Sequence, residues 1–140
     1  MTDSSTMEDY FVMENVKEQT MDIYETLLGL TFSKITAVEA WHEEVSYYEV
    51  RDTQTMDILG HFYLDLHPRK DKYNHAGVFQ LLKRVKIGTK IRTPIVAMVT
   101  NFKKSSKDKP SLISHSDTVT FFHEFGHIMH AVCTEANYNR

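Results

Sequence analysis

Apolar positions near the start of the chain recur at helical spacing. Those expected on one face are Val16, Ile23, Tyr24, Leu27 and Leu28. Their intervals are close to multiples of the helical repeat, so they predict an amphipathic helix whose apolar face packs in the core. Gly29 follows directly and is typical of the residue that ends a helix.

The middle of the chain has the pattern of strands. Residues 45–51 are rich in valine and tyrosine, and residues 58–66 alternate cleanly. One face of the second run would carry Ile58, Gly60, Phe62, Leu64 and Leu66, and the other Leu59, His61, Tyr63 and Asp65. The polar residues 52–57 between the runs predict an antiparallel hairpin. Residues 93–102 predict a third strand, with Pro94 confined to its start.

The remaining central segments predict a short helix and several loops. The helix covers residues 37–45 and carries Trp41 and His42. The loops are a charged turn at 68–72, a small-residue loop at 73–77 with His75, and a basic loop at 103–110. The lysines of the last loop are expected to be solvated, because it lacks the aromatic residues of a nucleic-acid site.

Residues 118–133 predict a second helix, with Ser116 or Asp117 as its N-cap. The segment has no proline and a single glycine. Its large apolar residues are Phe121, Phe122, Phe125, Ile128, Met129 and Val132. They cover much of the helix circumference, so the helix is expected to be buried against other parts of the protein.

Composition narrows the class of protein. The chain has 140 residues, of which 41% are hydrophobic, enough for one domain over residues 10–140 behind a frayed tail at 1–9. A formal charge of −3 disfavours a nucleic-acid or membrane-surface binder. No apolar run approaches the roughly 18 residues that span a bilayer, and the polar first residues lack a signal or transit pattern. Cys133 is the single cysteine, which excludes an internal disulfide and favours a reducing compartment, the cytoplasm.

The second predicted helix contains His123, Glu124 and His127 in the pattern H-E-x-x-H. Residues i and i+4 lie about 6 Å apart along a helix axis, so two imidazoles can converge on one zinc ion. Glu124 lies roughly 100° around the helix from His123, where it can act as general base on a zinc-activated water without being a ligand. The alternative is a polar stripe that binds no metal. The apolar neighbours favour the zinc site, because unpaired polar groups among them would be costly.

A catalytic zinc ion usually has three protein ligands and a water molecule. His130 lies about 10.5 Å along the axis from His123, too far for both to reach one ion easily. Glu135 would lie about 12 Å beyond His127 if the helix continues. The metzincin pattern is excluded because position 130 is histidine and position 133 is cysteine. The candidates that only tertiary folding could bring close are His67, His75, His115 and Asp117.

Ordered blocks of residues extend beyond this motif along nearly the whole chain. They are Tyr10-Phe11, residues 27–32, residues 40–43, residues 50–52, residues 62–66, Pro68-Arg69, Lys72-Tyr73, His75-Ala76, residues 97–99, Asn101-Phe102, residues 110–112, residues 122–127 and Met129-His130. In this order the blocks resemble the thimet oligopeptidase and neurolysin family of zinc metallopeptidases, which cut short peptides internally. The resemblance covers residues 10–133.

The resemblance implies a fold of the α+β class that is mainly helical. A small antiparallel sheet would lie beside the zinc-binding helix, as one piece of a larger helical protein with a deep channel. It implies His123 and His127 as zinc ligands and Glu124 as general base. It further implies that residues 93–102 hold an extended peptide by β-strand addition.

The resemblance also implies missing parts. The family's third zinc ligand, a glutamate on the next helix, would lie beyond Arg140, as would residues that steady the substrate. The loop at His75-Ala76-Gly77 resembles a flexible segment near the family's cleft. Asn74 stands where the family tends to have glycine, which predicts a stiffer loop.

Two hypotheses of function result. The first is a zinc metalloendopeptidase acting on short peptides, in the cytoplasm or alternatively the mitochondrion, with low activity for this chain alone because a ligand is missing. No nucleic-acid or membrane partner is expected. The second is a non-catalytic module that binds a partner or regulates a longer relative. Exposed apolar surface on the second helix and the sheet would then promote self-association.

Overall fold

The computed structural model describes residues 10–36, 45–68, 76–102 and 112–138. Within these ranges the chain forms two helices and nine short strands. In order they are β1 (Tyr10–Val12), α1 (Met13–Leu28), β2 (Leu30–Lys34), β3 (Ser46–Asp52), β4 (Ile58–Asp65), β5 (Gly77–Leu82), β6 (Val85–Ile87), β7 (Lys90–Arg92), β8 (Ile95–Val99), β9 (Leu112–Ser114) and α2 (His115–Tyr138). None of the helices in the described ranges is long and apolar enough to cross a membrane.

The main sheet has five strands in the order β2-β3-β4-β8-β5. The predicted hairpin is confirmed, because β3 and β4 pair antiparallel with Tyr48 opposite Phe62. β8 confirms the third predicted strand over a shorter range, but it runs parallel to β4 and antiparallel to β5. The expected antiparallel sheet is therefore a mixed sheet. The chain leaves β4, forms the β5–β8 hairpin, and re-enters beside β4 in the same direction.

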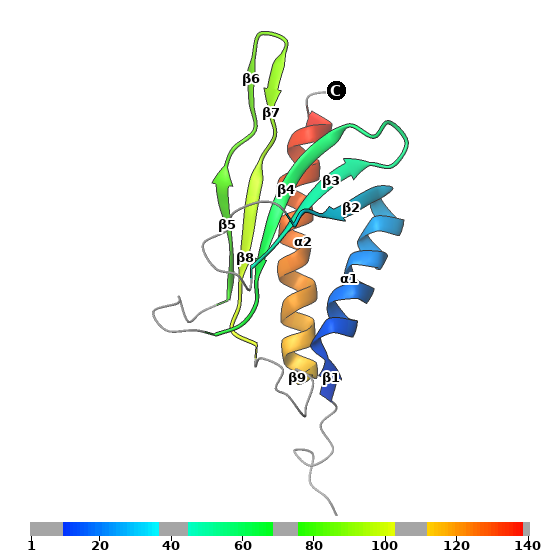
Figure 1. The fold of residues 1–140 in the computed structure, drawn as a ribbon, viewed down its shortest axis with the longest axis vertical. Coiled ribbons are helices and arrows are strands. Elements are labelled where there is room, and N and C mark those ends of the chain that lie inside the picture. The colour runs from blue at the N-terminus through cyan, green and yellow to red at the C-terminus, as the bar shows by residue number, and fades with distance from the viewer. Residues whose placement is uncertain (1–9, 37–44, 69–75, 103–111, 139–140) are drawn as a thin grey trace, which may run out of the picture.

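α2 lies along one face of this sheet, as Figure 1 shows (orange to red). The alternation predicted for β4 is confirmed in its centre, since Gly60, Phe62 and Leu64 are buried. The rings of Phe62 and Phe125 meet edge to face at a centroid distance of 5.4 Å. Within residues 115–133 of α2, for which burial is described, the buried hydrophobic side chains are Phe121, Phe125, Ile128, Met129 and Val132. The core therefore lies between α2 and the sheet.

The predicted N-terminal helix and its end are confirmed in α1. Gly29 has φ +67°, a left-handed conformation that is costly for other residues, and its N–H bonds to the Glu25 carbonyl. The predicted apolar face is wrong in its second half. Ile23 is 44% exposed and Leu27 71% exposed, whereas Met13 and Val16 are buried. α1 packs into the core through its first turns, and periodicity alone does not tell how far along a helix its neighbours extend.

The N-cap expected for the second helix is also corrected. Ser114, rather than Ser116 or Asp117, caps α2, because its Oγ accepts the backbone N–H of Asp117 at 3.1 Å. The helix begins at His115 and continues to Tyr138. β9, which contains Ser114, pairs with β1, so the starts of α1 and α2 are held side by side.

The expectation of a mainly helical protein is wrong for this chain. Two helices lie against a five-stranded sheet, and the small β1–β9 and β6–β7 pairs add further strands. The helical expectation came from the larger proteins that the chain resembles. Several sequence predictions lie outside the described residues: the tail at 1–9, the helix at 37–45 except Val45, the turn at 68–72 except Pro68, Asn74 and His75 in their loop, and the basic loop at 103–110.

Candidate metal centre

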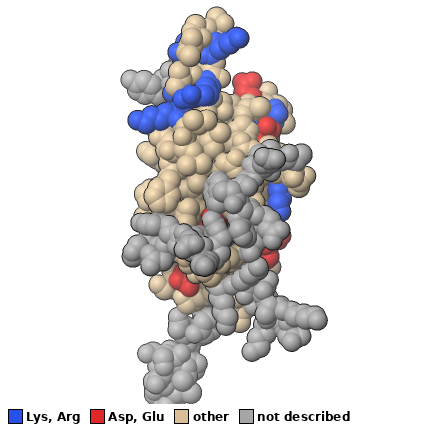
Figure 2. Space-filling model, turned by 60° about the vertical axis from the view of Figure 1, so that its left-hand side comes forward, with Lys and Arg blue, Asp and Glu red and all other residues tan. Residues whose placement is uncertain are grey.

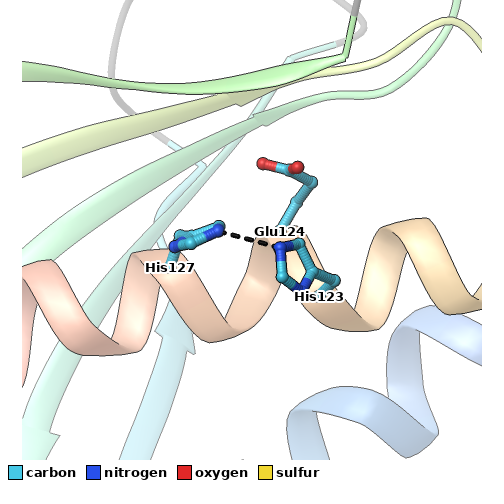
Figure 3. Close-up of side chains that lie close together, drawn as sticks. All are labelled: His123, Glu124 and His127. Carbon is cyan, nitrogen blue, oxygen red and sulfur yellow. Dashed lines mark hydrogen bonds between the residues drawn. The ribbon is translucent and has the colours of Figure 1, made fainter.

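α2 brings the two motif histidines together on its exposed side. The Nε2 atoms of His123 and His127 lie 3.0 Å apart, and one ring donates a hydrogen bond to the other. The rings meet edge to face at a centroid distance of 4.6 Å. Figure 3 shows them turned toward each other, with Glu124 extending beside them from the same helix. The structure therefore gives the two imidazoles one common focus.

The Glu124 carboxylate belongs to the same cluster. One ligand atom from each of His123, Glu124 and His127 lies within 4.8 Å of the other two. Among the described residues this is the single group of three or more His, Cys, Asp or Glu side chains that could hold a metal ion. Both histidines are exposed, so an ion and a substrate could reach them from solvent.

The donor set fits zinc. Two nitrogen ligands at about 2.0–2.1 Å from a tetrahedral ion lie about 3.3 Å apart. The observed Nε2–Nε2 distance of 3.0 Å is close to that value, so binding would need only a small separation of the rings. The hydrogen bond between the rings would be replaced by two bonds to the ion.

Core packing fixes the direction in which the histidines project. Phe121, Phe125 and Ile128 alternate with the motif residues along α2 and are fully buried. Because residues three and four apart share a helix face, burying this stripe turns His123 and His127 to the opposite side. Phe125, a variable position of the motif, contacts both Phe32 and Phe62 edge to face.

A groove of about 770 Å³ lies beside the two histidines. Besides these two residues, it is lined by Tyr24 of α1 and by Thr118, Val119, Phe122, Gly126 and His130 of α2. Burial raises the pKa of the Tyr24 phenol, which keeps it neutral at physiological pH. The groove therefore combines a largely apolar surface with the two candidate ligands.

Nearly the entire chain, including this site, matches a known protein family. The profile of Peptidase family M3 matches residues 2–140. The chain belongs to Peptidase family M3. The family is one of zinc oligopeptidases, which agrees with the resemblance drawn from the sequence blocks.

The chain is similar to proteins from several organisms, two of which are named oligopeptidases. The chain is 40% identical over 139 residues to thimet-like oligopeptidase of Dictyostelium discoideum, covering 98% of this chain and 21% of that protein. It is 39% identical over 135 residues to saccharolysin of Saccharomyces cerevisiae, covering 91% and 19%. It is 30% identical over 126 residues to oligopeptidase A of Salmonella typhimurium, covering 89% and 18%. The chain thus spans about one fifth of the length of these M3 relatives.

The structure also tests the candidates for a third ligand. His67, His115 and Asp117 lie in the described part of the chain and do not join the cluster. His67 instead bonds through Nδ1 to the Phe102 carbonyl at 2.9 Å. His130 lines the groove without joining the three-residue group, as its distance along the helix predicts. His75 lies outside the described residues.

Glu135 is the remaining acid, and its backbone lies in α2. Because α2 is one continuous helix to Tyr138, the chain does not reverse between His127 and Glu135. Their separation along the axis is about 12 Å. Among the described residues, the candidate metal cluster therefore consists of two histidines and one carboxylate: His123, His127 and Glu124.

The prediction that residues 93–102 hold a peptide by strand addition is wrong, because their strand lies inside the sheet. β8, within residues 93–102, has β4 on one side and β5 on the other, so neither of its edges faces outward. The edge strand on this side is β5, which also packs against α2. Sequence alone did not identify β5, because its apolar residues Val78, Phe79, Leu81 and Leu82 lack the period-2 alternation of a half-buried strand.

Tyr24 and Gly126 are two of the groove residues that sequence reasoning did not assign to the site. Tyr24 has the spacing of a core residue, and it does contact Phe125 at a centroid distance of 5.4 Å. Its hydroxyl group, however, reaches the turn of α2 that carries His123 and His127. A polar tip on an otherwise apolar helix face was the signal available in the sequence.

Proposed function

We propose that this chain is the metal-bearing part of a zinc endopeptidase that hydrolyses peptide bonds in short peptides. The observation that supports the proposal most is the convergence of His123 Nε2 and His127 Nε2 at 3.0 Å with the Glu124 carboxylate beside them. Membership in a family of oligopeptidases gives the substrate class.

His123 and His127 would hold the zinc ion through their Nε2 atoms. When bound, zinc supplies a Lewis acid that polarises the scissile carbonyl and activates water. Glu124 accepts a proton from the attacking water at its carboxylate and then delivers it to the leaving amine nitrogen. Each cycle returns Glu124 to the ionised state, and because water is the nucleophile, no covalent bond to the protein forms.

The edge of β5 would hold the peptide. A strand at the edge of a sheet offers its outward N–H and C=O groups to an extended chain. β5 borders α2, so a peptide added to it would pass close to the metal-bearing helix. β8 takes no part in this pairing.

The isolated chain should bind zinc weakly and cleave peptides negligibly. A catalytic zinc site usually has three protein ligands, and the described residues bring only two histidines together with the candidate base. Loss of a partner that merely orients a ligand already costs 10–100-fold in metal affinity or activity. Loss of a ligand should cost more.

Zinc titration tests the metal half of the proposal. The wild-type chain should bind one zinc ion, and His123→Ala or His127→Ala should weaken binding at least tenfold. His130→Ala is the matched control, because His130 lies on the same helix and groove but outside the cluster. An equal loss in all three variants, or no loss in any, would contradict the assignment.

A chimera tests the catalytic half. The matching part of saccharolysin would be replaced by this chain, which is 39% identical to it. The chimera should cleave a quenched fluorescent peptide and lose that activity by about 10²-fold or more in Glu124→Gln, with zinc content unchanged. A folded, zinc-loaded chimera whose activity survives this change would refute the role of Glu124.

A second candidate function is a non-catalytic module that associates through apolar surface. It is favoured by the exposed side chains of Leu27 and Val119 and by the open groove that Val119 lines. Light scattering distinguishes the candidates: the module should form concentration-dependent oligomers, whereas a sharp monomer peak would count against it.

A further inference from the structure

A narrow ribbon of two strands projects beyond the main sheet. β6 and β7 pair antiparallel around a turn at Gly88 and Thr89, and Figure 1 shows them extending from the ends of β5 and β8. Residues 83–92 contain five cations and no acid, in a chain whose formal charge is −3. The cations are Lys83, Arg84, Lys86, Lys90 and Arg92. Figure 2 shows lysine and arginine side chains gathered at this end of the molecule.

The ribbon lysines are available to a ligand. Lys83, Lys86 and Lys90 are exposed. In the described part of the chain, lysine ion pairs are confined to the one between Lys17 and Glu14, so these three ammonium groups are not neutralised there. The base of the ribbon is held by Arg92, whose Nη2 donates to the Lys83 carbonyl at 3.1 Å.

Each of the two cross-strand pairs nearest the turn combines a cation with an aliphatic residue. Lys86 lies opposite Ile91, and Lys90 lies opposite Ile87. Partners in an antiparallel pair project to the same face, so both faces of the ribbon offer an ammonium group beside an apolar side chain. Ile87 is 75% exposed. Such a surface suits a ligand that carries carboxylates next to apolar groups.

The position of the ribbon indicates which acidic ligand it meets. It continues the line of β5, the sheet edge along which the proposed function places the peptide. An extended chain advances about 3.3 Å per residue, so the six steps from Gln80 to Lys86 cover about 20 Å. A peptide on β5 with several residues beyond the sheet would therefore reach the lysines with one end only.

We propose that the β6–β7 ribbon binds acidic residues at one end of the peptide substrate, which makes acidic oligopeptides the favoured substrate class. The proposal rests on the proposed function, because that function places the peptide along β5. The ribbon contains no aromatic residue, which disfavours single-stranded nucleic acid as its ligand. Its continuity with the peptide-binding edge favours a peptide over a lipid surface.

Binding of labelled peptides to the full 140-residue chain, followed by fluorescence anisotropy at low salt, tests this proposal. Three peptides of about twelve residues share one neutral core and carry a run of glutamates at the N-terminal end, the same run at the C-terminal end, or glutamines at both. One acidic peptide should bind at least tenfold more tightly than the glutamine peptide, and the other should not. The gain should vanish in Lys86→Glu/Lys90→Glu and fall steeply with added salt.

The matched control is Lys17→Glu/Lys34→Glu, which changes the net charge equally at sites away from the ribbon. It should keep the end-specific gain. An equal gain at both ends, or loss of the gain in the control, would overturn the proposal. Lys86→Gln/Lys90→Gln, which removes charge without reversing it, repeats the test if the first variant does not fold.

Two further measurements distinguish a peptide-binding ribbon from a membrane-binding one and from a failure of the metal site. Ribbon-dependent binding to phosphatidylserine vesicles, without any preference between peptide ends, would assign the ribbon to a membrane and overturn the proposal. The peptide assay is repeated with chelator and in His123→Ala, where the end-specific gain should persist. Zinc binding that depends on His123 without an acidic preference would refute the ribbon alone, whereas the preference without zinc binding would refute the metal site alone.

Discussion

The hydroxyl oxygen of Tyr24 lies 3.0 Å from the point that a Cβ atom would occupy at Gly126. The same ring lies against Phe122, at a centroid distance of 5.2 Å, and its hydroxyl is 3.5 Å from the Phe122 carbonyl oxygen. Tyr24 thus reaches α2 within the turn that carries His123 and His127. Glycine at position 126 is what lets α1 approach so closely.

Replacing Gly126 should therefore have opposite effects in two backgrounds. Alanine is favoured over glycine in a helix interior by about 0.8–1.0 kcal/mol. In the wild-type chain, Gly126→Ala must displace the Tyr24 hydroxyl, so this gain should be lost or reversed. In Tyr24→Phe, the nearest ring carbon is 3.9 Å from the new Cβ, an ordinary contact, and Gly126→Ala should stabilise the fold. Urea unfolding of the four proteins measures the coupling.

The C-terminal end of α1 supplies the control for this cycle. Gly29 has φ +67° with no atom within 4 Å of its Cβ position, so Gly29→Ala is strained by conformation and not by contact. The cost of Gly29→Ala should therefore be the same in the wild-type chain and in Tyr24→Phe. Equal effects of Gly126→Ala in both backgrounds would show that Tyr24 does not restrict this position.

The hydrophobic core of the fold and the pairing of His123 with His127 could be predicted from the sequence. Alternation in residues 58–66 correctly identified the face of β4 that packs on α2 in the centre of the strand. There Gly60, Phe62 and Leu64 are buried, whereas the residues between them are only half-buried. The H-E-x-x-H spacing correctly brought His123 and His127 together, because i and i+4 share a face of any helix. Both inferences depend only on local geometry.

The missed features depend on tertiary neighbours. The exposure of Leu27 follows from where α1 leaves the core, which helical spacing does not encode. The interior position of β8 depends on which strands pair, and hydrogen bonding between distant segments has no local signature. The β6–β7 ribbon did have a local signature in the sequence, since Gly88-Thr89 between two alternating segments is typical of a two-residue hairpin loop.

The contact between Phe62 and Phe125 should be essential to stability. Phe62 is fully buried and also contacts Tyr48 and Phe32 at centroid distances of 5.1 and 5.6 Å. Phe62→Ala should lower the free energy of unfolding by about 3–5 kcal/mol, as truncation of a buried phenylalanine does. Ile58→Ala, at the exposed start of the same strand, should cost much less. Chemical denaturation followed by circular dichroism would show whether the two losses differ; similar losses would contradict this core.

The groove beside the metal cluster should bind a hydrophobic dye. Val119 and Phe122 are exposed on its wall. Val119→Gln should reduce the fluorescence of bound 8-anilinonaphthalene-1-sulfonate without unfolding α2, because the side chain is already 54% exposed. Leu112→Gln, at an exposed position of β9 outside the groove, is the matched control. A dye signal that both changes reduce equally would place the binding elsewhere.

The free energy of unfolding should depend on pH in the acidic range because of His61. The Nε2 atom of His61 lies 3.6 Å from Glu49 Oε2, and its ring stacks on that of Tyr47 at a centroid distance of 5.2 Å. Burial lowers the pKa of His61 more than Glu49 raises it. The unfolded chain, with a histidine pKa of about 6.5, therefore binds a proton more readily than the folded one. The stability contributed by neutral His61 is complete above about pH 6.5 and is lost as the pH falls from there through the lowered folded pKa.

Urea unfolding should show that wild type loses more stability than His61→Phe on acidification, and NMR titration should give His61 a pKa below about 6.5. Parallel pH profiles for the two proteins would contradict this assignment.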